Sequence, residues 1–159
     1  MAKQEGHRRQ SKDGEVEMEA MEWQLDPGVA SKLYDAFTIA GLRVDAIEPG
    51  RALICSFTVP PRLTDASKRM HGGALASLVD LVGSAMIFAG GSPTTGVSLE
   101  ITISYLNAAR ANEEIEIDAR VVGIRERTGC VTVEVRKKAT GEVIAHGRHT
   151  KYLAVSSKL

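Results

Sequence analysis

The sequence has no net charge, few aromatic residues and few cysteines, and each shortage argues against a class of protein. Lys+Arg and Asp+Glu both number 20, so no overall charge would attract nucleic acid or a membrane surface. Aromatic residues make up only 4% of the chain and are not interleaved with a basic stripe, which disfavours nucleic-acid binding. Cys55 and Cys130 lie far apart in apolar runs, a pattern typical of reduced core thiols rather than of a disulfide framework.

Metal-binding and membrane-spanning patterns are also missing. His146 and His149 are separated by two residues in a strand-like run, so their side chains face opposite sides and we expect no metal site. No apolar run is long enough for us to expect a membrane span, and the N-terminus has no signal-peptide hydrophobic block.

The length of 159 residues and the hydrophobic fraction of 43% are those of one globular domain. We expect a mobile N-terminal arm at 1–24, a domain at 25–155 and a tail at 156–159. The tail ends in Ser157-Lys158-Leu159, the tripeptide read by the peroxisomal import receptor. The expected location is therefore the peroxisome, or the cytosol if the tripeptide is not read.

The N-terminal half of the domain alternates helix-like and extended patterns. Asp26-Pro27 has the residues of a helix start, and the amphipathic pattern that follows closes near Gly41. Residues 42–59 are strand-like with a break at Pro49-Gly50, and residues 62–70 form a polar loop.

The segment from His71 to Ala89 has almost no polar face, which predicts a buried helix ended by Gly90-Gly91. From Thr95 onward the apolar period changes to two, and four strands are expected. The class is therefore α+β: an antiparallel meander with one hydrophobic helix covering one face.

One polar stripe interrupts the hydrophobic helix: Gly73, Ser77, Asp80 and Ser84 are spaced for a single face. Asp80 is the only ionisable residue between His71 and Ala89. A carboxylate in apolar surroundings is costly unless it is paired or used, and such burial tends to raise its pKa. Both a functional Asp80 and a buried Asp80 satisfied by Ser77, Ser84 or a backbone amide of a neighbouring element fit this pattern.

His71-Gly72-Gly73 stands where the helix begins. Bare first-turn N–H groups and the helix dipole favour negative charge there, as an oxyanion on a thioester carbonyl would need. A plain tight entry turn is the alternative, and for His71 a structural capping role is favoured over a catalytic one.

The spacing between Gly72 and Asp80 constrains any shared site. Eight residues of helix separate their backbones by about 12 Å, too far for both to approach one carbonyl carbon. An antiparallel second copy of the helix would bring Gly72 of one subunit near Asp80 of the other. A common site predicts a composite site and at least a dimer.

The combination of several short motifs resembles the hotdog thioesterases, and in particular the acyl-CoA thioesterase 13 branch, also called thioesterase superfamily member 2. The resemblance covers about Gly41 to Leu153, and the residues that carry it are His71-Gly72-Gly73, Leu78-Val79-Asp80, Gly96-Val97-Ser98, Ile103-Ser104-Tyr105 and Gly147-Arg148-His149-Thr150-Lys151. It implies a five- or six-stranded antiparallel sheet wrapped around one long helix, assembled as dimers and commonly as dimers of dimers.

The resemblance also implies an activity and roles for individual residues. The activity is hydrolysis of an acyl-CoA, here a medium- to long-chain fatty acyl-CoA, to free acid and CoA. Asp80 matches the catalytic carboxylate, Gly72 the glycine whose amide binds the thioester oxygen, and Ser98 the serine that helps to place the water. The Gly73 amide is a second candidate donor, and Asp80 acts either as general base or as nucleophile.

Coenzyme A would enter as part of the substrate, and we expect no separate cofactor. Its phosphates need cations at the pocket mouth. The candidates are Arg125, Arg127, Arg148 and Lys151, with Tyr105 and Tyr152 for the pantetheine channel. A solvated surface charge or a packed tyrosine is the alternative for each of them.

One position departs from the family pattern. Animal relatives tend to carry Asn six residues before the histidine, where this chain has Asp65, a second carboxylate for which we expect no defined role. Two other functions stay open. A hotdog hydratase or dehydratase would use a catalytic His paired with an acid, and an acyl-CoA-binding module would need no buried carboxylate.

Overall fold

The computed structural model describes residues 27–153. The expected arm at 1–24, the Asp26 cap and the Ser157-Lys158-Leu159 tripeptide therefore lie outside the described residues. The elements are α1 (Pro27–Ile39), β1 (Arg43–Glu48), β2 (Ala52–Thr58), the 3₁₀-helix η1 (Pro61–Leu63), α2 (Gly72–Ala89), β3 (Val97–Tyr105), β4 (Glu114–Ile124), β5 (Thr128–Lys137) and β6 (Val143–Tyr152).

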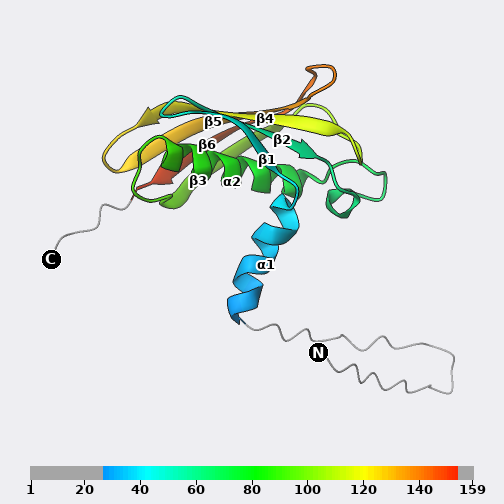
Figure 1. Ribbon diagram of the computed structural model, residues 1–159, viewed down its shortest axis with the longest axis horizontal. Coiled ribbons are helices and arrows are strands. Elements are labelled where there is room, and N and C mark those ends of the chain that lie inside the picture. The colour runs from blue at the N-terminus through cyan, green and yellow to red at the C-terminus, as the bar shows by residue number, and fades with distance from the viewer. Residues whose placement is uncertain (1–26, 154–159) are drawn as a thin grey trace.

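The six strands form one antiparallel sheet in the order β1-β2-β4-β5-β6-β3. Figure 1 shows the curved sheet wrapped over α2, while α1 projects away from these two layers. The α+β class and the long central helix are confirmed. In the loop at 62–70, Thr64 and Met70 form an isolated bridge that closes it just before α2.

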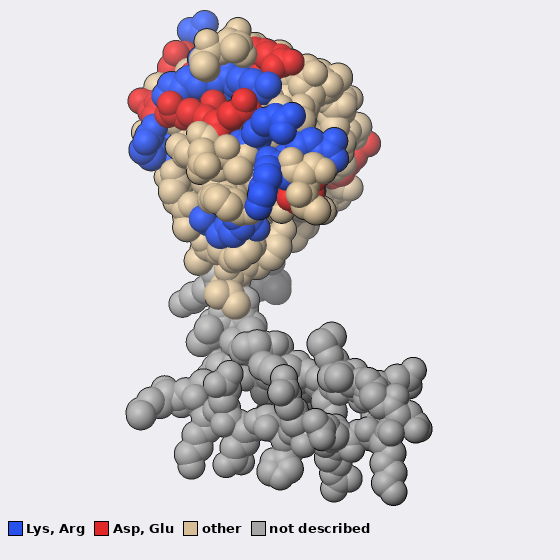
Figure 2. Space-filling view, turned by 90° about the vertical axis from the view of Figure 1, so that its right-hand side faces the viewer, with Lys and Arg blue, Asp and Glu red and all other residues tan. Residues whose placement is uncertain are grey.

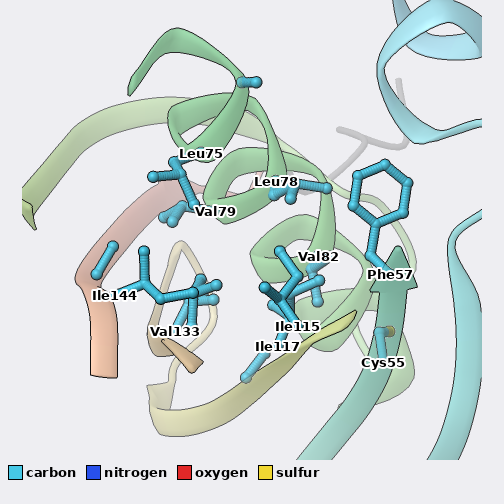
Figure 3. Packing of buried hydrophobic residues seen from close by; sticks show 14 of the residues in the cluster. Cys55, Phe57, Leu75, Leu78, Val79, Val82, Ile115, Ile117, Val133 and Ile144 are labelled. Carbon is cyan, nitrogen blue, oxygen red and sulfur yellow. The ribbon is translucent and has the colours of Figure 1, made fainter. Parts of the chain in front are cut away.

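The core lies between α2 and the face of the sheet that the helix covers. The inward positions of β4 and β5 alternate with outward ones, as the period-two pattern predicts. Figure 3 shows these residues packed against the helix; fully buried members include Phe57, Leu78, Val79, Ile115, Ile117, Val133 and Ile144.

Two glycines allow α2 to approach β6 closely. A Cβ on Gly147 would come within 2.7 Å of Val79 Cγ1, and a Cβ on Gly83 would come within 3.1 Å of His149 Nδ1. Any larger residue at either position would push the helix away from the strand. This contact brings the polar stripe of α2 beside β6.

A β-bulge in β3 changes which residues share a face. Ser98 pairs with Lys151 and Glu100 pairs with Thr150, so Leu99 is the extra residue. Simple alternation would have placed Ser98 on the face opposite Ile101. Because of the bulge, Ser98 shares the inner face with Ile101, which corrects the regular alternation expected for this strand.

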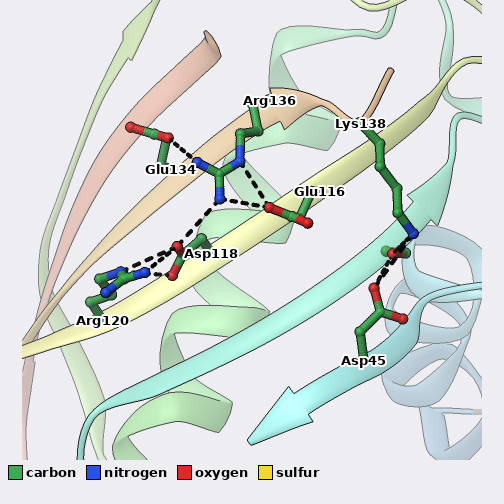
Figure 4. A network of polar contacts seen from close by, with 8 residues as sticks. Asp45, Glu116, Asp118, Arg120, Glu134, Arg136 and Lys138 are labelled. Carbon is green, nitrogen blue, oxygen red and sulfur yellow. Dashed lines mark hydrogen bonds and ion pairs between the residues drawn. The ribbon is translucent and has the colours of Figure 1, made fainter. Parts of the chain in front are cut away.

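The face of the sheet opposite α2 carries a network of charged side chains (Figure 4). Asp118 and Glu134 stand opposite each other in β4 and β5, where two negative charges would repel. The Arg136 guanidinium lies 3.1 Å from Glu134 and 3.6 Å from Asp118, and Arg120 lies 2.8 Å from Asp118. Figure 2 shows that acidic and basic side chains are also intermingled at one end of the molecule.

The hydrophobic helix is less enclosed than its composition suggests. Ala85 and Phe88 of α2 are exposed, which corrects the expectation of a helix buried all round. Its length and hydropathy match a membrane span, contrary to our reading of the sequence, but half of that window is buried inside the protein, as in a core helix.

The two cysteines lie in different surroundings. Cys55 is buried in β2, and burial raises the pKa of its thiol to about 11. Cys130 in β5 is half-buried, with its Sγ 3.2 Å from Arg148 Nε.

Candidate active site

Asp80 lies near the middle of α2, and its side chain is 43% exposed. The Ser84 hydroxyl, one helical turn further on, donates to Asp80 Oδ1 at 3.3 Å. The sequence predicted apolar surroundings for this carboxylate, and that expectation was wrong. Asp80 lies instead near the Ser84 hydroxyl and near two side chains of β6, the imidazole of His149 and the ammonium of Lys151.

His149 of β6 is the nearest ring to Asp80, and sequence reasoning missed its part in this cluster. Its Nε2 lies 3.6 Å from Asp80 Oδ1 and 2.8 Å from Ser98 Oγ. The bulge at Leu99 is what turns Ser98 toward it. The sequence did contain a signal for this contact. His149 lies two residues after Gly147, so both face the side of β6 that packs on the helix.

The His149 ring is fully buried, and burial lowers its pKa although Asp80 acts in the opposite direction. The ring is therefore neutral near pH 7. Nδ1 has no hydrogen-bond partner within residues 27–153. The ring meets Ser98 and Asp80 through Nε2, and its tautomer decides which of Ser98 and His149 is the donor.

Lys151 is the second residue of β6 whose side-chain nitrogen faces α2. It is only 5% exposed, and its Nζ donates to Ser84 Oγ at 2.6 Å. Burial lowers the pKa of this ammonium, while the charge of Asp80 acts in the opposite direction. The structure thus places Lys151 in the Asp80 cluster rather than at the surface where a phosphate-binding cation was expected.

His71 caps the N-terminus of α2. Its Nδ1 accepts from the Gly73 N–H at 3.0 Å, and its carbonyl accepts from the Ala74 N–H at 2.9 Å. Among residues 27–153, no acceptor takes the Gly72 N–H. The Gly73 amide is thus already engaged, and the Gly72 amide is the one left for a ligand.

Tyr105, at the end of β3, holds the same helix start. Its hydroxyl donates to the Gly72 carbonyl at 3.1 Å, and its ring lies 3.6 Å from where a Gly72 Cβ would be. The Tyr105 side chain is thus packed on the exposed glycine turn. Its contact is with the helix start and not with the Asp80 cluster.

One chain therefore carries two separate half-sites. The first holds Asp80, Ser84, Ser98, His149 and Lys151 in the middle of α2 and on the facing strands. The second holds His71, Gly72, Gly73 and Tyr105 at the helix start. Their separation along the helix remains about 12 Å, the rise of eight residues.

Comparisons with known proteins agree with this arrangement. A family model described as the thioesterase superfamily matches residues 68–144. Human acyl-coenzyme A thioesterase 13 is 36% identical over 105 residues, which are 66% of this chain and 74% of that protein. The chain belongs to the thioesterase superfamily.

Solved structures of this superfamily share the fold. Zebrafish thioesterase superfamily member 2 has a TM-score of 0.71 and 29% identity, covering 82% of this chain and 100% of that one. The mouse protein of the same name has a TM-score of 0.71 and 28% identity, covering 86% and 100%. The hotdog fold expected from the sequence is confirmed.

Asp65, the departure from the superfamily pattern, is engaged within its own loop. Its carboxylate accepts from the Ser67 N–H at 2.8 Å and the Arg69 N–H at 3.0 Å, and it pairs with the Arg69 guanidinium at 3.1 Å. The Arg69 backbone N–H, followed by the other contacts, lowers the pKa of this carboxyl. Asp65 is therefore a charged loop cap that shapes the approach to His71.

The other candidate substrate-binding residues are not gathered in one chain. Arg125 and Arg127 are exposed in the β4–β5 hairpin, and Arg148 is exposed on the outer face of β6 beside Cys130. Tyr152 is 37% exposed near the end of β6. His146 is exposed and His149 buried, so the two histidines do face opposite sides; within residues 27–153 no group of three metal-ligating side chains occurs.

Proposed function

We propose that the protein hydrolyses acyl-CoA thioesters to a free acid and coenzyme A. The observation that carries the proposal is the cluster of Asp80, Ser98 and His149, a carboxylate beside a hydroxyl whose orientation is fixed by a buried neutral ring. Membership of the thioesterase superfamily and the name of the human relative support the same chemistry.

The hydrogen-bond directions around Ser98 suit a bound water. In the proposed tautomer the His149 ring proton is on Nε2 and is donated to Ser98 Oγ, which leaves the Ser98 hydrogen free to donate to the oxygen of the attacking water. Asp80 takes a proton from that water as it attacks the thioester carbon. Direct attack by Asp80 to form an anhydride is the alternative, and incorporation of heavy oxygen from solvent into Asp80 would reveal it.

The Gly72 amide is the proposed oxyanion donor. Its N–H is free among the described residues and stands at the positive end of the α2 dipole. The carbonyl oxygen of the thioester would accept this N–H while negative charge develops on it. The Gly73 amide is excluded from this role unless His71 turns away, because His71 Nδ1 already takes its proton.

A composite site between two subunits follows from the separation of the half-sites. The strand β3 stands at the edge of the sheet, and Val97 and Leu99 are 63% and 61% exposed on it. The exposed side of α2 includes Phe88, which is 59% exposed. An antiparallel second subunit covering these surfaces would bring its Gly72 to Asp80; a dimer of dimers is the proposed final assembly.

The proposed substrate is a medium- to long-chain fatty acyl-CoA. Beside the polar stripe of α2 lie Leu81, Ala85 and Phe88, which would offer an acyl chain an aliphatic wall. Peroxisomal import through Ser157-Lys158-Leu159 is proposed as the route to the substrate. A fusion labelled at the N-terminus should reach peroxisomes and should stay in the cytosol when Leu159 is removed.

Release of free thiol from a panel of acyl-CoAs tests the proposed activity. Thiol release that depends on Asp80 supports hydrolysis, and the panel identifies the acyl length. The pairing of His149 with Asp80 favours one other candidate, a hydratase, but the His149 ring is 0% exposed and cannot reach a substrate within this chain. Hydration of an enoyl-CoA without thiol release would refute the hydrolase and support the hydratase; binding without either reaction would indicate a non-catalytic module.

A further inference from the structure

Lys151 is a buried cation on the inner face of β6. It pairs with Ser98 in β3 and with Gly129 in β5. Lysine is rarely buried, because removing an ammonium from water is costly unless it is paired. A lysine that is 5% exposed thus requires a compensating contact.

The compensating contact leads to Asp80 through Ser84. Lys151 Nζ donates to Ser84 Oγ at 2.6 Å, and Ser84 Oγ donates to Asp80 Oδ1 at 3.3 Å. Within residues 27–153, no carboxylate lies within 4.0 Å of the ammonium, so Ser84 is its route to a negative charge. Because the serine oxygen accepts from the ammonium, its own hydrogen is directed onward to Asp80.

This chain of contacts engages one oxygen of the Asp80 carboxylate and leaves its other oxygen available. Oδ1 of Asp80 receives the Ser84 hydrogen and lies near His149 Nε2, while no donor within residues 27–153 bonds to Oδ2. A carboxylate held by one oxygen presents the second in a fixed direction. Low local dielectric strengthens such a relay.

We propose that Lys151 is a positioning residue for Asp80: through Ser84 it fixes the orientation of the carboxylate. The proposal rests on the proposed function, in which Asp80 accepts a proton from water. Burial lowers the pKa of Lys151 and the charge of Asp80 acts in the opposite direction, which shows that the two groups lie close enough to interact. The other titratable group facing this cluster is His149, which is neutral and so does not replace the cation.

The test measures kcat and KM separately for Lys151→Met and Lys151→Gln. Methionine keeps the volume and removes both charge and donor, whereas glutamine keeps a donor for Ser84 and removes the charge. We expect at least about a tenfold lower kcat for Lys151→Met with little change in KM, because the carboxylate loses the hydrogen-bond chain that orients it. Lys151→Gln, which keeps a donor for Ser84, should recover part of that loss.

Two further variants separate this effect from loss of folding. Ser84→Ala cuts the relay without touching the lysine and should lower kcat with little change in KM. Lys137→Met removes a half-buried lysine that is paired with Glu142, away from the Asp80 cluster, and should leave kcat and KM unchanged. Thermal unfolding of each variant checks that it is folded.

The outcomes distinguish the two proposals. A wild-type protein that releases no thiol from any acyl-CoA overturns the proposed function itself. An active wild type whose folded Lys151→Met and Ser84→Ala variants keep the wild-type kcat overturns the role of Lys151 alone.

Discussion

The Ser98 hydroxyl lies 2.8 Å from Nε2 of His149, across the pairing of β3 with β6. Neither residue would reach the other in a regular ladder, because the bulge at Leu99 is what turns Ser98 inward. The contact fixes the direction of the serine hydroxyl next to Asp80. Bulges are common beside active sites because they re-aim single side chains.

The Ser98→Ala variant tests whether the oriented Ser98 hydroxyl takes part in the reaction. Removing the hydroxyl takes away the donor proposed for the attacking water but leaves Asp80 in place, so kcat should fall about ten- to a hundredfold with little change in KM. Steady-state kinetics measure it. Ser104→Ala is the matched control, because Ser104 is an exposed serine on the same strand and should leave kcat unchanged. A Ser98→Ala variant with wild-type kcat would remove Ser98 from the mechanism.

The sequence predicted the elements of this fold better than the contacts of its site. The alternating apolar residues of β4 and β5 and the apolar run of α2 predicted which residues are buried. This works because burial along an element repeats with the geometry of that element. A bulge inserts one residue without altering composition, so alternation alone placed Ser98 on the wrong face. The burial of Lys151 depends on its strand neighbours in β3 and β5 and on Ser84 of α2, which no local pattern reveals.

Asp80 illustrates the same limit. Its helix position and its separation from Gly72 followed from spacing. Its polar surroundings did not, because they come from β6, about 70 residues later in the chain. Motif resemblance supplied the pairing of Asp80 with Gly72, and only the packed structure added His149 and Lys151.

His149 should make stability depend on pH. An unfolded histidine takes up a proton near its ordinary pKa of 6.5, whereas burial lowers the pKa of the folded ring. Below about pH 6.5 the unfolded chain therefore binds more protons than the folded one, and the free energy of unfolding falls as the pH falls. Denaturant unfolding between pH 7 and pH 5 measures this loss.

The matched variants are His149→Gln and His146→Gln. His149→Gln should lose this part of the pH dependence, although it is less stable overall because a packed ring is removed. His146→Gln changes an exposed histidine of the same strand and should keep the wild-type slope. Parallel curves for wild type and His149→Gln would show that the ring is not held neutral.

Tyr105→Phe separates a positioning role from a substrate-binding one. The change removes the hydrogen bond to the Gly72 carbonyl and keeps the ring packed on the glycine turn. We expect kcat to fall about two- to tenfold, the equivalent of a net hydrogen bond of about 0.5–1.5 kcal/mol, with little change in KM. A raised KM at constant kcat would instead indicate that Tyr105 contacts the pantetheine chain.

The composite site can be tested with two variants that are each inactive. Asp80→Asn removes the proposed base. Gly72→Pro removes the proposed N–H donor, and proline suits the first helical position. The backbone of His71, at φ −68° and ψ 136°, already has the extended conformation that a residue before proline requires.

Co-expressed Asp80→Asn and Gly72→Pro subunits should form hybrids with one intact site. In a twofold dimer one site would join the native Gly72 of the first variant to the native Asp80 of the second, and the other site would carry both changes. Purified hybrids should therefore reach about half of the wild-type kcat per dimer, while each variant alone stays inactive. Because a site built within one subunit would carry a defect in every chain, hybrids as inactive as their parents would refute the composite site between two subunits.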